Sequence, residues 1–171
     1  MAASNLTPPA SNVVITHPNR SKPVVQSTRL LVIVLLVVSA ALVMVITIGG
    51  WNVLENAIPI EFGYALIYLL LAFYAWRWNR GVLPVASSLA VFLAIFALVS
   101  GSSWFERNKP GFEQPPLGSG LLGTLTFLVI PVQILLIGFA MRGFSQGWNV
   151  ELEQSASDAG VDFREGEPHT A

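Results

Sequence analysis

The chain contains no cysteine and only two histidines among its 171 residues. Without cysteine it cannot form a disulfide-stapled ectodomain, a thiolate metal site, an iron–sulfur cluster or a thiol nucleophile. The histidines, His17 and His169, lie in polar stretches near the two ends of the chain. Neither is placed to bind haem, or to act as a base, inside an apolar helix. We therefore expect no cofactor, no metal site and no enzymatic activity.

Charged residues are also scarce. Asp, Glu, Lys and Arg make up 11% of the chain, whereas soluble domains contain about 25%. Hydrophobic residues make up 53%, and the formal net charge is −1. Nucleic-acid binding, which needs a clustered basic surface, is not expected. The composition favours a protein whose main partner is the lipid bilayer.

The chain does have four long apolar segments. At a rise of about 1.5 Å per residue, a helix of roughly 19 residues crosses the ~30 Å hydrocarbon core. The segments span residues 30–48, 58–76, 82–100 and 121–141. We predict an all-α fold: an integral membrane four-helix bundle, with a disordered N-terminal tail over residues 1–29 and an acidic, largely disordered tail over residues 142–171. A cleavable signal peptide is the alternative for the first segment, but its apolar run is longer than the usual ~7–15 residues.

The basic residues predict how the chain threads through the membrane. Four crossings place both termini on one side, together with Arg77 and Arg80 in the turn between the second and third segments. Only Arg107 and Lys109, of the 9 basic residues, then fall on the opposite side. Because an excess of Lys and Arg marks the cytoplasmic face, we predict cytoplasmic termini in a multi-pass protein of the bacterial plasma membrane. The five tryptophans lie at or just beyond segment ends, the level that amphipathic indoles prefer.

Polar residues inside the apolar segments are few. No charged residue lies in the core of any segment, and Glu61 lies in the first turn of the second, where an acid also complements the helix dipole. This argues against a proton-coupled pump or an ion exchanger. Gln133 and Pro131 either serve helix packing or line a substrate path. By its depth in the fourth segment, Gln133 is expected to face Ser87 and Ser88.

The longest loop, predicted over residues 101–120, is the best candidate for a functional surface. Trp104 stands next to an adjacent acid and base, Glu106 and Arg107. Such a loop covers the bundle or docks a partner, or its aromatic residues simply anchor it at the level of the lipid headgroups. These three residues and Gln133 are the candidate interaction or path residues.

Two functions follow from these observations. The first is a non-enzymatic accessory or structural subunit of a membrane complex, which packs against a membrane-protein partner or a second copy of itself. It would use the outer loop and a ridge of small residues on the third segment, Ser87, Ala90, Ala94, Ala97 and Gly101. The alternative is a small transporter or channel component with a path near Pro131 and Gln133.

Overall fold

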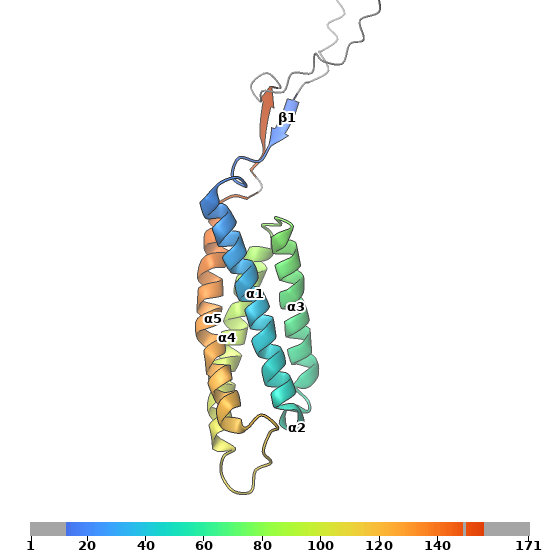
Figure 1. Ribbon diagram of the computed structural model, residues 1–171, viewed down its shortest axis with the longest axis vertical. Coiled ribbons are helices and arrows are strands. Elements are labelled where there is room, and N and C mark those ends of the chain that lie inside the picture. Colours follow the sequence, from blue (N-terminus) through green and yellow to red (C-terminus); the bar gives the residue numbers. More distant parts are fainter. Residues whose placement is uncertain (1–12, 149, 156–171) are drawn as a thin grey trace, which may run out of the picture.

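The computed structural model describes residues 13–148 and 150–155. Figure 1 shows a bundle of long helices, and a short helix, α2 (Trp51–Leu54), lies between the first two of them. The long helices are α1 (Pro23–Gly49), α3 (Ile58–Trp76), α4 (Val82–Glu106) and α5 (Ser119–Ser145). All 4 are long and apolar enough to cross a membrane. The predicted all-α membrane four-helix bundle is confirmed.

Large apolar side chains cover the outside of the bundle. Leu98, Ile134 and Val99 are 62%, 62% and 69% exposed. Within the most apolar window of each long helix, only 28–39% is buried inside the bundle. Water-soluble domains rarely expose such large contiguous apolar surfaces. Hydrocarbon is therefore the surrounding that suits this surface.

Two four-residue strands lie beyond one end of the bundle (Figure 1). Strand β1 (Val13–Thr16) pairs antiparallel with β2 (Leu152–Ser155), with Val13 opposite Ser155. We call this the ribbon end, and the opposite end, which holds α2 and the 107–118 connection, the loop end. The two strands meet at the ribbon end, as an even number of crossings requires.

The structured part of the chain is longer than the sequence predicts. Disorder over the whole of residues 1–29 is wrong for residues 13–29, and disorder over 142–171 is wrong for the described residues up to 155. Pro23 begins α1 in the first turn, where its missing N–H costs nothing. Gln146 Nε2 donates to Thr28 Oγ1 at 3.0 Å, so contacts with the segment after α5 hold the start of α1. Residues 1–12 and 156–171 lie outside the described residues.

Aromatic and basic side chains close the ribbon end. Trp148 is fully buried and meets the Trp78 ring edge-on, with ring centroids 5.9 Å apart. The Arg29 guanidinium lies 3.9 Å from the Trp78 ring centroid, and Arg20 Nε donates to the Trp148 carbonyl oxygen at 3.4 Å. Trp148 therefore lies just beyond the end of α5, as predicted, but its ring packs inside the protein instead of facing lipid.

The ridge of small residues on α4 packs against α5. Gly101 lies so close to this helix that a Cβ atom there would be 2.9 Å from the Phe127 ring, and one at Gly123 would be 2.7 Å from Phe105. The Phe105 and Phe127 rings stack with centroids 6.1 Å apart. The ridge is a helix-approach face, as predicted. It is used within the chain, however, so the expectation that it is offered to a partner is wrong.

Replacing Ser87 with alanine should change stability only slightly, and the direction of the change can be predicted. Its side chain is 7% exposed, and its Oγ has no hydrogen-bond partner among the described residues. A buried hydroxyl without a partner destabilises the fold. Ser87→Ala should leave the free energy of unfolding unchanged or raise it by up to about 1 kcal/mol, as measured by SDS titration in mixed micelles. A loss of about 1 kcal/mol or more would show that the hydroxyl is satisfied.

Candidate functional site

A cavity of about 420 Å³ lies between α3 and α4 at the loop end. The two helices are joined by a short turn at the ribbon end and contact each other little elsewhere. Where they do meet, the rings of Tyr64 and Phe96 pack edge to face with centroids 6.4 Å apart, and they bound the cavity on the side of the membrane interior. Helices α1, α2 and α5 supply the remaining walls.

The cavity wall is mostly aliphatic and aromatic. Val43 and Ile46 come from α1, Leu93 and Ala97 from α4, and Val129 from α5. Among the described residues, the wall also contains the polar or charged side chains of Glu61, Ser100, Ser103, Arg107 and Thr126, and the aromatic rings of Tyr64 and Trp104 add a hydroxyl and an N–H. An apolar wall with a few polar groups is typical of small-molecule sites, whose volumes range over about 300–1,000 Å³.

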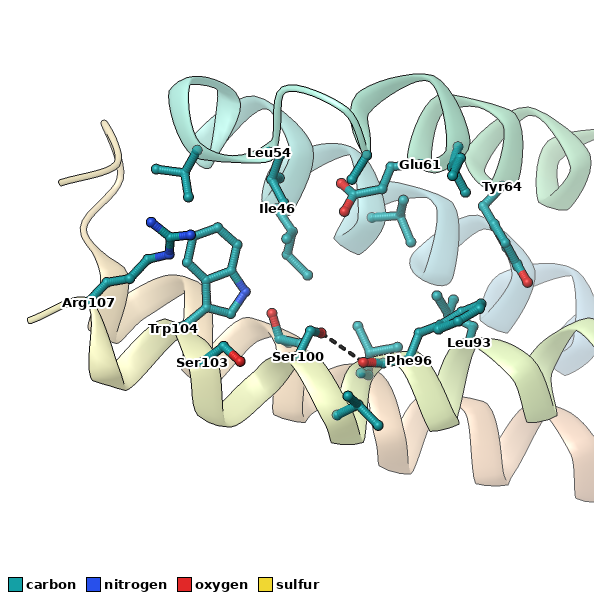
Figure 2. A pocket seen from close by; sticks show the side chains of 18 residues that line it. Ile46, Leu54, Glu61, Tyr64, Leu93, Phe96, Ser100, Ser103, Trp104 and Arg107 are labelled. Carbon is teal, nitrogen blue, oxygen red and sulfur yellow. Dashed lines mark hydrogen bonds between the residues drawn. The ribbon is translucent and has the colours of Figure 1, made fainter. Parts of the chain in front are cut away.

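Glu61 is the one acid among the described residues that line the cavity, and it lies in the first turn of α3. Figure 2 shows its carboxylate turned toward the cavity. Thr47 Oγ1 lies 2.5 Å from Glu61 Oε2 and 2.7 Å from the carbonyl oxygen of Val43. Because a threonine hydroxyl carries a single proton, it donates to only one of these acceptors at a time. The hydroxyl holds the carboxylate in place and satisfies it only in part.

Trp104 separates the charged residues of the site. Its side chain is 5% exposed, and Figure 2 shows its indole ring between the Arg107 guanidinium and Glu61. Arg107 follows the last residue of α4, and its carbonyl oxygen accepts a hydrogen bond from Gln114 Nε2 at 2.6 Å. This bond ties the loop to the end of α4, and Arg107, which follows that end, lines the cavity.

The structure corrects the predicted setting of two candidate residues. Trp104 and Glu106 belong to α4, because this helix continues to Glu106 instead of ending near residue 100. Gly101 does not break the helix, since its missing side chain admits the Phe127 ring. Trp104 and Arg107 line the cavity, whereas Glu106 is exposed and does not. The predicted headgroup anchor is thus wrong for Trp104.

Gln133, the fourth candidate, lies outside the cavity in the centre of the bundle. It is 0% exposed. Tyr68 Oη donates to its Oε1 at 3.0 Å, and its Nε2 donates to Ser39 Oγ at 2.9 Å. These two bonds connect α5 with α3 and with α1. Gln133 therefore cross-links three helices.

The predicted contact of Gln133 with Ser87 and Ser88 is wrong. Ser88 is exposed and donates to the carbonyl oxygen of Pro84 at 3.0 Å. Ser87 has no hydrogen-bond partner among the described residues. Depth along a helix fixes the level of a residue but not the direction in which it faces, so a correct level led to the wrong partner.

No protein-family model, curated protein or solved structure matches this chain. Among the described residues no group of three or more His, Asp or Glu side chains could hold a metal ion. The cavity, which contains a carboxylate that the sequence marks only as a helix-dipole partner, is therefore the feature from which a function can be argued. A sequence signal for Glu61 did exist, since no other acid lies inside a predicted apolar segment.

Proposed function

We propose that this protein is a non-enzymatic, multi-pass protein of the bacterial plasma membrane that binds a small, mainly apolar molecule in the cavity between α3 and α4. The observation that carries the proposal is the cavity itself, about 420 Å³ in volume and walled mostly by apolar side chains. The basic residues Arg20, Arg29 and Arg80 lie toward the ribbon end, which supports a cytoplasmic ribbon end and an outward-facing loop end.

The bilayer is the natural source of this molecule. At the rim of the cavity, Ile60 on α3 is 63% exposed and Val99 on α4 is 69% exposed. Both side chains suit hydrocarbon better than water. An apolar molecule dissolved in the membrane could pass between α3 and α4 without meeting an exposed charge.

Binding accounts for the site better than conduction does. A path near Pro131 and Gln133 would need a polar, open interior, but both polar atoms of the Gln133 amide are engaged with neighbouring helices. At the ribbon end, the fully buried Trp148 packs against the Trp78 ring and against Gly143 of α5. These contacts favour a site with one entrance over a continuous channel.

The accessory-subunit role remains a second candidate, favoured by exposed aromatic residues at the loop end. Trp51 and Phe62 meet edge to face with ring centroids 6.2 Å apart, and they are 48% and 38% exposed. Phe112, in the connection before α5, is 52% exposed. This surface suits the membrane-embedded face of a partner. Loss of a defined complex on Phe112→Ser, seen as a change in the mass of the purified particle, would support this role.

Filling the cavity should abolish binding of an apolar probe. Ser100 lines the cavity, whereas Ser102 is exposed on the same helix and does not. In phosphatidylcholine nanodiscs, 1-decanol at about 100 times its dissociation constant should stabilise the wild type by about 2.7 kcal/mol. The Ser100→Phe variant should gain almost none of this, and the matched Ser102→Phe variant should gain all of it. Equal gains in both variants would place the probe elsewhere.

A further inference from the structure

We propose that the molecule bound in this cavity carries a positive charge and that Glu61 is its counter-ion. The ligand class is then a small lipophilic amine or quaternary ammonium ion. This inference rests on the proposed function, since it names the kind of molecule that the same cavity holds.

Within residues 13–148 and 150–155, the Glu61 carboxylate has no charged partner on the side that faces the cavity. A carboxylate in apolar surroundings is costly unless it is paired or hydrogen-bonded. Among the described residues its side-chain hydrogen bond is with Thr47, whose one proton also has the carbonyl oxygen of Val43 within reach. The carboxylate faces the cavity with the acceptor lone pairs that Thr47 does not use (Figure 2). A cation placed there would complete its coordination.

Among the residues that the structure describes, no basic side chain lies next to the Glu61 carboxylate. Arg107 stands beyond the Trp104 ring, on the side away from Glu61 (Figure 2). Lys109 lies in the exposed connection after α4. Tyr64, one turn further along α3, turns its hydroxyl away from Glu61 (Figure 2). The positive charge that balances Glu61 would therefore come with the ligand.

The aromatic wall suits the same kind of ligand. Rings of Tyr64, Phe96 and Trp104 line the cavity. Ring faces attract cations, and quaternary ammonium groups are recognised by aromatic cages of this composition. The aliphatic part of the wall, which includes Ile46 and Leu93, would cover the hydrocarbon body of the ligand. Charge recognition and apolar burial thus converge in one place.

A structural role for Glu61 predicts different behaviour. On that view the acid complements the N-terminus of α3 and links this helix to α1 through Thr47. Glu61→Gln separates the two roles, because the amide oxygen of glutamine still accepts the Thr47 hydrogen bond while the negative charge is gone. Glu55→Gln is the matched control, since Glu55 is an exposed acid at the same end of the bundle and outside the cavity wall.

The test compares three probes of equal chain length in phosphatidylcholine nanodiscs: decyltrimethylammonium, 1-decanol and decyl sulfate. In the wild type the cation should bind most tightly. Glu61→Gln should weaken binding of the cation by about tenfold or more and change that of decanol by less than about twofold. Glu55→Gln should bind all three probes as the wild type does.

Several results would overturn the assignment and leave the cavity function standing. Tighter binding of decyl sulfate would make Arg107 the charged determinant. If Glu55→Gln and Glu61→Gln weaken cation binding equally, the cation is attracted by the negative charge of this end of the protein and not by Glu61 in the cavity. Phosphatidylcholine carries a quaternary ammonium and phosphatidylethanolamine a primary one. Loss of probe-cation binding when the second lipid replaces the first would mean that the primary ammonium of a lipid headgroup occupies the site, and the site would be assigned to a lipid instead of a small amine. If no probe binds the wild type better than Ser100→Phe, the proposed function itself fails.

Discussion

Replacing Trp148 with alanine should lower the free energy of unfolding by about 3–5 kcal/mol, the cost typical of removing a fully buried tryptophan. Its indole ring is 0% exposed and meets the Trp78 ring edge-on. Its Nε1 donates to Gln146 Oε1 at 3.3 Å. Gly143 makes room for the ring, because a Cβ there would lie 2.9 Å from it. The variant would therefore leave a cavity between α5 and the α3–α4 turn.

The measurement is SDS titration of the purified protein in mixed micelles. Trp76→Ala is the matched control, because Trp76 is 62% exposed near the same end of the bundle, and it should cost less than about 1 kcal/mol. Trp148→Phe should fall between the two, since phenylalanine fills part of the space. A loss below about 1 kcal/mol for Trp148→Ala would mean that the ribbon end is not packed as described.

Replacing Gln133 with leucine should cost about 1–3 kcal/mol, the penalty for leaving a buried polar group without a partner. Tyr68, which is 0% exposed, would lose the acceptor of its hydroxyl. Ser39 would keep one hydrogen bond, because its Oγ also donates to the carbonyl oxygen of Leu35 at 2.7 Å. Single hydrogen bonds between membrane helices average about 0.6 kcal/mol. The larger figure expected here reflects the stranded tyrosine.

A double-mutant cycle isolates this contact. Tyr68→Phe together with Gln133→Leu should cost less than the sum of the two single changes, since the pair leaves no unmatched tyrosine hydroxyl. Ser88→Ala is the control for a polar change on an exposed helix face and should stay within about 0.5 kcal/mol. If Gln133→Leu is neutral while the micelle assay resolves Trp148→Ala, the cross-link between α1, α3 and α5 does not hold the bundle together.

The membrane fold could be predicted from the sequence because its long apolar segments suit the hydrocarbon of a bilayer and do not suit water. Each run is long enough to cross the hydrocarbon core and is bounded by glycine, proline or charge, as at Gly49 and in the turn that holds Arg77 and Arg80. These features are local. Helix ends were less well predicted, because tertiary contacts at Thr28 and Gly101 extend α1 and α4 beyond their most apolar stretches.

The site could be predicted only in part. Trp104 and Arg107 stand out in the sequence as an aromatic residue near a charge, and both do line the cavity. The cavity itself exists because α3 and α4, which are adjacent in sequence, pack against other helices more than against each other. No local pattern reports this arrangement. Glu61 becomes notable only once its carboxylate is seen facing that space (Figure 2).

The direction in which the bundle crosses the membrane decides whether the cavity opens outward. Since the chain has no native cysteine, single cysteines at Ser27, Ser145 and Asn108 can be labelled in intact cells with a membrane-impermeant thiol reagent. Asn108→Cys should react at once, and Ser27→Cys and Ser145→Cys only after the membrane is permeabilised. Opposite behaviour of Ser27→Cys and Ser145→Cys would contradict an even number of crossings, and with it the bundle and the cavity on which the proposed function depends.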